Sequence, residues 1–229
     1  KVLNHQLAKL LPLLNDDGPS QADWVQLRAA GSHPGITAVE IENVTVSYGP
    51  GQPSVLEDFS LRATTGDFVV VTGPSGTGKS TLLAVLLGFL APQNGTYRLT
   101  ANEADAFNAL QHVAWCPQEA YLFDSTLRSN LALAREPARR PTDEECQAVL
   151  ETVGLGEWLA EAPQGLDTRL GPSGHFISGG QRQRVAVARA LLADAHVVLL
   201  DEPTAHLGAD EAAELISDLK VALQDKIVV

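Results

Sequence analysis

The chain has 229 residues, of which 45% are hydrophobic, 19% charged and 5% aromatic, a composition typical of a folded globular protein and not of a collagen-like or largely disordered one. Its 16 Lys and Arg against 28 Asp and Glu give a formal net charge of -12, which argues against an extended basic surface for nucleic acid, so any phosphate site must be local. The longest apolar run, 82–91, is shorter than the roughly 18 to 20 residues that span a bilayer, and two cysteines without metal-type spacing favour structural thiols in a reducing, cytosolic compartment.

The first 35 residues are predicted to form a helix and a linker. Leucines at spacings of three and four over 1–14 predict an amphipathic helix, and the segment lacks the cleavage site of a secretory signal. Residues 15–35 are rich in Asp, Gly, Pro, Ser and Ala with little periodicity, which is typical of a linker. We therefore expect the folded domain to begin near Ile36.

Strands dominate the next part of the chain. Apolar and polar residues alternate over 39–48 and 55–63, which predicts two half-exposed strands. The apolar, β-branched run 68–72 predicts a buried strand. A glycine-rich turn follows, and then a helix over about 79–90.

From about residue 124 to 192 the pattern is mostly helical. Thr142 stands three residues before Glu145, the spacing of a helix N-cap, and Gly154 is placed to end that helix. Further on, the sequence predicts a buried strand over 197–200, a helix over 209–223 and a third buried strand starting at Ile227. This alternation of strand, turn and helix predicts a parallel sheet wrapped by helices.

A glycine-rich segment after the predicted strand 68–72 fits the pattern G-x-x-x-x-G-K-[ST] and opens a helix, which is the context that a phosphate-binding loop requires. Backbone N–H groups and the positive end of the helix would hold phosphate oxygens. Lys79 would reach the β and γ phosphates, and the Ser80 hydroxyl would be a ligand for Mg²⁺. The loop consists of Gly73, Pro74, Ser75, Gly76, Thr77, Gly78, Lys79, Ser80 and Thr81.

Two carboxylates follow the apolar strand 197–200. Asp201 suits Mg²⁺, which prefers few carboxylates and several waters, and Glu202 could orient or deprotonate an attacking water. Alone, such a pair is more often a solvated strand end. Together with the phosphate loop it favours a nucleotide site at the carboxyl edge of a parallel sheet.

A second glycine-containing motif, Ile177-Ser178-Gly179-Gly180-Gln181, precedes an Arg- and Ala-rich helix. Ser178 can cap this helix and the glycines leave N–H groups open, which makes a second anion site. With this motif the chain resembles the nucleotide-binding domain of ABC (ATP-binding cassette) proteins, whose signature is Leu-Ser-Gly-Gly-Gln. The resemblance implies an α/β P-loop NTPase (RecA-like) core, an antiparallel β subdomain and a helical subdomain over about 124–192.

The resemblance covers about 36–229 and assigns further residues. Tyr48 corresponds to the aromatic residue that stacks on adenine. Gln118 corresponds to the glutamine that contacts Mg²⁺ and the attacking water. Phe123, Thr126, Asn130 and Leu131 follow it at the spacing of exporters, and 165–171 resembles the exporter loop that touches the membrane domain.

The chain departs from the family pattern at two positions. Pro172 stands where exporters usually have Glu, and Gly208 replaces the Asp that couples the two nucleotide sites. His206 is not the switch histidine, since that residue would follow the strand beginning at Ile227. We therefore expect the sequence to be part of a longer protein and these residues alone to hydrolyse ATP weakly.

The resemblance implies an ATPase that drives an exporter. Its cofactors would be ATP and Mg²⁺, with Ser80, Gln118 and Asp201 as metal ligands and Lys79, Gln118 and Glu202 as catalytic residues. Its partners would be a second nucleotide-binding domain, identical or homologous, and a membrane domain of the same polypeptide whose cytosolic tail is 1–35. Ser178 to Gln181 would act on the nucleotide of that second domain.

Other classes stay open from the sequence. A soluble ABC ATPase of DNA repair or chromosome structure would share these motifs, but the charge of -12 and the absence of heptads argue against it. An ABC-type translation factor would carry two cassettes. The segment 115–127 is similar to the CydC and CydD proteins, which suggests export of cysteine or glutathione for cytochrome bd assembly.

Overall fold

The structure is a computed structural model that describes residues 24–29, 35–49, 51–101, 112–119, 121–193, 195–205 and 207–229. The chain divides into two compact units, one made of 1–113 with Val229 and the other of 114–228. The helix predicted over 1–14 lies outside the described residues.

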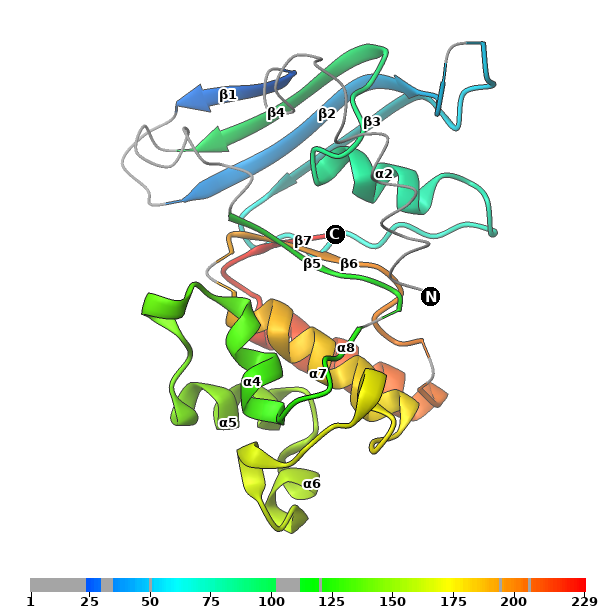
Figure 1. The fold of residues 1–229 in the computed structure, drawn as a ribbon. Helices are drawn as coiled ribbons and strands as arrows, with labels where there is room; N and C mark the ends of the chain where they lie inside the picture. Colours follow the sequence, from blue (N-terminus) through cyan, green and yellow to red (C-terminus); the bar gives the residue numbers. More distant parts are fainter. Residues whose placement is uncertain are drawn as a thin grey trace. The chain divides into compact units, whose positions relative to one another are not determined.

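The first unit is built on a four-stranded sheet with the strand order β1-β4-β2-β3 (Figure 1). β2 pairs antiparallel with both β3 and β4, and β1 pairs parallel with β4. The strands predicted over 39–48 and 55–63 and the antiparallel β subdomain are thereby confirmed. The four strands are β1 (Val25–Ala29), β2 (Ile36–Val46), β3 (Leu56–Thr64) and β4 (Asn94–Ala101).

Strand β1 corrects the predicted linker. It lies inside 15–35 and matches its residues to β4 from Val25 opposite Tyr97 to Ala29 opposite Ala101. The Trp24 ring, just before the strand, lies 5.7 Å from the Tyr97 ring. Apolar and polar residues do alternate over 25–29, but five residues between turn-forming segments are a weak signal, and pairing with a distant strand decides the structure.

Helix α2 (Lys79–Leu86) lies against one face of this sheet (Figure 1), and the Tyr97 hydroxyl donates to the Leu86 carbonyl at 2.9 Å. The helix ends before the predicted residue 90 because Gly88 takes a left-handed conformation, with φ of 74°. Residues 68–72, predicted as a buried strand, form no continuous strand, and Val70 is 67% exposed. An apolar run gives a local preference only, whereas a strand also needs a partner along its whole length.

The second unit contains a small sheet with the order β5-β6-β7. Strands β6 and β7 are parallel, with Val197 opposite Ile227. The three strands are β5 (Val113–Cys116), β6 (Val197–Leu200) and β7 (Ile227–Val228), and the last two fall where the sequence analysis predicts them. Asp201 follows β6 directly, and its N–H donates to the Cys116 carbonyl at 2.9 Å.

Helices make up most of the second unit, as predicted. Thr142 and Glu145 form the expected capping box of α5, and Gly154 ends that helix with φ of 69°. Helix α7 packs against α4 and α5 and runs beside the sheet (Figure 1). The helices are α4 (Leu127–Leu131), α5 (Asp143–Thr152), α6 (Gly156–Glu161), α7 (Gly179–Leu192) and α8 (Ala209–Ala222), with short 3₁₀ turns η2 (Ala132–Ala134), η3 (Pro137–Arg139), η4 (Gly165–Asp167) and η5 (Pro172–Gly174).

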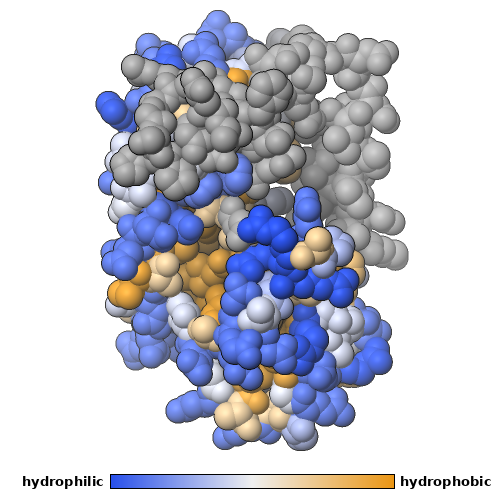
Figure 2. Space-filling model, turned by 90° about the vertical axis from the view of Figure 1, so that its left-hand side faces the viewer, coloured by the Kyte–Doolittle hydropathy of each residue, from blue (hydrophilic) through white to orange (hydrophobic). Residues whose placement is uncertain are grey.

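On the face drawn in Figure 2 the described surface is largely hydrophilic, and hydrophobic residues gather near the middle of the view and at its lower end. Within the described ranges, no helix combines the length and the apolar character needed to cross a membrane. Both cysteines, Cys116 and Cys146, are free and buried, as expected for structural thiols.

Candidate nucleotide-binding sites

The predicted phosphate loop is held in shape by its glycines and by Thr77. Gly78 has φ of 95°, and a Cβ there would lie 2.8 Å from Leu56 Cδ2 and 3.0 Å from the Val55 carbonyl. Thr77 Oγ1 donates to the Pro74 carbonyl at 2.9 Å. The backbone therefore passes close to β3 at a point where only glycine fits, and it enters α2 at Lys79.

The start of α2 has the properties of an anion site. Gly78 provides no side-chain cap, and the first turn contains no acidic residue, so the N–H groups and the positive end of the helix dipole are left to an external acceptor. Lys79 Nζ donates to the carbonyls of Gly73 and Pro74, both at 2.9 Å, which holds the ammonium group at the loop. Ser80 is exposed in the same turn.

Tyr48, the predicted adenine-stacking residue, lies next to the first turn of α2. Its hydroxyl oxygen is 2.8 Å from Thr81 Oγ1, and its side chain is 61% exposed. The first unit thus brings together an exposed aromatic ring, a lysine ammonium and an uncapped helix start, which can bind a base and phosphate groups.

In the second unit, the structure brings Gln118 and Glu202 together. Gln118 Nε2 donates to Glu202 Oε2 at 2.6 Å, although 84 residues separate them in the sequence. Glu202 is exposed and has φ of 49°, a strained conformation for a non-glycine residue that recurs at functional sites. Asp201, half-buried, stands beside this pair in the sequence.

The Cys116 thiol, two residues before Gln118, is buried. Burial raises the pKa of Cys116 to about 12, and the charges of Arg189 and Asp201 have smaller, opposing effects on that pKa. The same burial lowers the pKa of Arg189. The thiol therefore stays protonated and unreactive at neutral pH, which agrees with a structural role.

The signature segment starts α7 as predicted. Ser178 Oγ accepts from the Gln181 N–H at 3.1 Å, and Gln181 Oε1 accepts from the Ser178 N–H at 2.9 Å. A cavity of about 420 Å³ opens beside this helix start. It is lined by Gly154, Leu155, Trp158, Ser178, Gly179, Gly180, Gln181, Arg184, Leu207 and Glu211.

Sequence reasoning missed Trp158 and Arg184 in this cavity. Arg184 is 8% exposed, and its Nη1 donates to the Val153 carbonyl at 2.7 Å. A Cβ on Gly154 would collide with that guanidinium. The available signal was Gly154 itself, which leaves room for Arg184 as well as ending α5.

The segment after Gln118 is joined to the loop that precedes Ser178. Leu127 N–H donates to the Thr168 carbonyl at 2.9 Å, and Leu170 N–H donates to the Ser125 carbonyl at 3.0 Å. Asn130, which is 1% exposed, accepts from the Phe123 N–H at 2.8 Å through Oδ1. Among the residues at the exporter spacing, Asn130 therefore has a buried hydrogen-bonding role.

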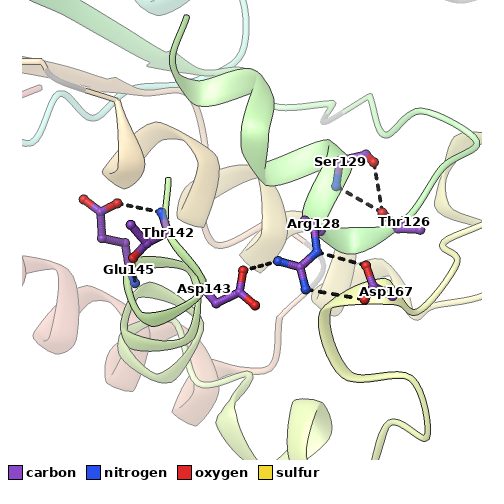
Figure 3. A network of polar contacts seen from close by, with 7 residues as sticks. All are labelled: Thr126, Arg128, Ser129, Thr142, Asp143, Glu145 and Asp167. Atoms are coloured by element: carbon purple, nitrogen blue, oxygen red, sulfur yellow. Dashed lines mark hydrogen bonds and ion pairs between the residues drawn. The ribbon is translucent and has the colours of Figure 1, made fainter. Parts of the chain in front are cut away.

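Arg128 reinforces this junction with ion pairs (Figure 3). Its Nε donates to Asp167 Oδ1 at 2.9 Å, and its Nη1 contacts Asp143 at the start of α5. The hydrogen bond from Arg128 lowers the pKa of the Asp167 carboxyl. Arg128 thus links α4, α5 and η4.

The two departures from the family pattern are accommodated locally. Pro172 begins η5, in which Ser173 has φ of 53°. Gly208 caps α8, and its N–H donates to Glu211 Oε2 at 3.1 Å.

The predicted residues fall into two groups. Tyr48 and the loop 73–81 belong to the first unit, whereas Gln118, Asp201, Glu202 and 178–181 belong to the second. An uncapped helix start after a glycine loop and a carboxylate pair after a parallel strand define the class of P-loop nucleotide-binding proteins.

Comparison with known proteins names the family. The model of the ABC transporter family matches residues 56–205, so the chain belongs to this family. It is 32% identical over 197 residues to a probable ABC transporter ATP-binding/permease protein of Haemophilus influenzae, which covers 85% of the chain and 35% of that protein. It is 33% identical over 194 residues to the ATP-dependent lipid A-core flippase of Burkholderia thailandensis, which covers 82% of the chain and 32% of the flippase.

A solved structure agrees with these relatives. The chain matches a bacterial Atm1-family ABC exporter with ATP bound, with a TM-score of 0.73 and 27% identity over 89% of this chain and 36% of that one. The chain is thus an exporter-type ABC ATPase domain that binds nucleotide, and the DNA-repair and translation-factor alternatives are not favoured. It spans only about a third of these relatives. The resemblance to CydC and CydD stays a prediction.

Proposed function

We propose that this domain binds ATP at the start of α2 and hydrolyses it to drive an exporter. The observation that carries the proposal is the uncapped first turn of α2 with the Lys79 ammonium held at the loop. Nitrogen donors of the loop would bind the phosphate oxygens, and Lys79 would exchange its bonds to loop carbonyls for bonds to the β and γ phosphates. The exposed ring of Tyr48 would stack on adenine.

Magnesium fits the oxygen donors of these residues. Ser80 offers a hydroxyl, Gln118 an amide oxygen and Asp201 a carboxylate, and such hard oxygen ligands, with waters, are what Mg²⁺ prefers. When bound, the ion would neutralise charge on the β and γ phosphate oxygens. The amide of Gln118 is compatible with this role because its nitrogen, not its oxygen, bonds to Glu202.

Glu202 would act as the base for the attacking water. The water oxygen forms a bond to the γ phosphorus, the bond to the bridging oxygen breaks, ADP leaves, and Glu202 accepts the proton. Gln118 would hold the carboxylate and the water in line, because its Nε2 already donates to Glu202 Oε2. Catalysis would thus consist mainly of positioning and charge stabilisation.

The signature would serve the nucleotide of a second nucleotide-binding domain, identical or homologous. Ser178 caps α7 without using the N–H groups of Gly179 and Gly180, and the first N–H groups of a helix have no partner inside it. A γ-phosphate held by the other domain would provide one. Two such domains would enclose two ATP molecules.

The partner in the membrane is inferred from the relatives. The Haemophilus influenzae protein is described as an ATP-binding/permease protein, so we propose that a membrane domain belongs to the same polypeptide and that the residues before β1 lead from it. The domain would then work at the cytoplasmic face of the membrane. Cysteine or glutathione is the proposed cargo, on the similarity of 115–127 to CydC and CydD.

Replacing Glu202 tests the proposed chemistry. Glu202→Gln should retain ATP binding, lose at least about 100-fold in ATP turnover and stabilise the ATP-bound dimer, because an amide cannot accept the proton. Phosphate release and sedimentation velocity with Mg-ATP measure these effects. Glu214→Gln, an exposed glutamate of α8, is the matched control. Because weak hydrolysis is expected of these residues alone, turnover is compared in the complete protein, and wild-type turnover there by Glu202→Gln would refute the role.

A further inference from the structure

A hydrogen bond links the predicted base-stacking residue to the phosphate helix. Tyr48 Oη and Thr81 Oγ1 lie 2.8 Å apart, and 33 residues separate them in the sequence. The Thr81 side chain is 4% exposed and sits in the first turn of α2, two residues after Lys79. The bond therefore ties an exposed ring directly to the element that carries the phosphate loop.

Packing alone does not fix the Tyr48 ring, because most of its side chain is exposed. Its backbone is held by the turn that follows β2: Ser47 Oγ donates to the Gly49 carbonyl at 3.1 Å, and Gln52 N–H donates to the same carbonyl at 3.2 Å. The hydroxyl at the far end of the ring is held by Thr81. With both ends fixed, one orientation of the ring is selected before any base binds.

We propose that Thr81 is a positioning residue that sets the orientation of the Tyr48 ring relative to the phosphate loop and so raises the affinity for the base of a nucleoside triphosphate. The inference rests on the proposed function, since it needs a nucleotide at α2. A ring fixed in advance loses less conformational freedom when the base stacks on it. In this proposal the Thr81 hydroxyl acts on base binding, through Tyr48, whereas its position in the loop motif predicts a contact with phosphate.

The two tasks for Thr81 predict different binding patterns. If Thr81 positions the ring, removing its hydroxyl weakens the binding of ATP but not of inorganic tripolyphosphate, which has no base. If Thr81 contacts phosphate, or if its loss damages α2, both ligands lose affinity together. One hydrogen bond of this kind corresponds to a loss of about threefold to tenfold in affinity.

Three single variants, one double variant and two ligands make the test. Thr81→Val keeps the shape of the buried side chain and removes the hydroxyl, Tyr48→Phe keeps the ring and removes its hydroxyl, and Thr81→Ser restores a hydroxyl at the first position. Binding of Mg-ATP and of Mg-tripolyphosphate is measured by calorimetry on the wild type, on these variants and on the double variant Thr81→Val with Tyr48→Phe.

We expect Thr81→Val and Tyr48→Phe each to lose about threefold to tenfold in ATP affinity, with tripolyphosphate within about twofold of the wild type. Thr81→Ser should regain ATP affinity, and the double variant should be no weaker than either single one, because both remove the same bond. Equal losses for both ligands, or unchanged ATP affinity, would overturn the inference. A wild-type protein that binds neither ligand would instead refute the proposed function. Tyr48→Phe changes an exposed side chain, so its folding is not in question.

Discussion

The helices α2 and α7 both begin after glycine-rich segments, but they differ in how the unpaired N–H groups of the first turn are capped. Before α2, Gly78 is the N-cap with φ of 95° and supplies no side-chain acceptor. Before α7, Ser178 and Gln181 form a complete capping box. Both helices present free N–H groups at their first turn, but only α7 has its own side-chain cap.

The difference indicates what each helix start is for. An uncapped start with a lysine and no acidic residue lowers its free energy by binding an anion, which is the reason that we propose α2 as the phosphate-binding helix. A capped start such as that of α7 is stable without a ligand. Its remaining N–H groups can still bind an anion that is held by a second domain. The family assignment fits this division, in which α2 would bind nucleotide and α7 would complete the site of a second domain.

The largest expected effect comes from breaking the α2 site. Lys79→Ala should lower ATP affinity by at least about 100-fold, because the positive charge and its bonds to two phosphates are lost. Calorimetric titration with Mg-ATP measures this affinity. Lys220→Ala, at an exposed position of α8, is the matched control. ATP affinity that survived Lys79→Ala would remove the contrast between the two helix starts.

A smaller effect is expected at α7. Ser178→Ala removes the cap and should lower the free energy of unfolding by about 1 kcal/mol, while the affinity of the chain for its own ATP stays within about twofold. Turnover should fall, since the second site would be damaged. Urea unfolding, calorimetry and phosphate release separate the three quantities, with Ser178→Thr as the variant that keeps the cap. A large loss of ATP affinity in Ser178→Ala would show that α7 serves its own nucleotide.

The smallest effect concerns the ion pairs that support the approach to α7. The pKa of Asp167 is lowered in the folded protein by Arg128, so the pair stabilises the fold above the ordinary carboxyl pKa of 3.8 and this contribution is lost as the pH falls through the lower, folded pKa. Asp167→Asn should therefore shift the urea midpoint slightly downward at pH 7 and not at pH 2. A shift of the same size at both values would mean that the charge is irrelevant.

Local signals predicted most of the fold and failed where distant pairing decides. The capping residues Thr142 and Ser178 lie within three residues of their partners, so the sequence alone locates both helix starts. Strand β1 depends on β4, some 70 residues away, and the local composition there predicts a linker instead. The run 68–72 has strong β preference but no continuous partner, which no local pattern reveals.

The same distinction holds for the sites. Motif spacing predicts the phosphate loop, the carboxylate pair and the signature, because each is a contiguous segment. The bonds from Tyr48 to Thr81 and from Gln118 to Glu202 join residues far apart in the chain. The family resemblance named Tyr48, Gln118 and Glu202 but not these contacts, and Gly154, which lies outside the motifs, was the signal for the buried Arg184 beside the signature.

A complementation assay tests most directly whether α2 of one chain and α7 of another share one ATP. Lys79→Ala and Ser178→Arg each disable both sites of a symmetric pair, but a mixed pair retains one intact site. We predict that the two inactive variants, mixed in a preparation whose wild type hydrolyses ATP, release phosphate well above the sum of the separate samples. A mixture as inactive as its components would contradict the account.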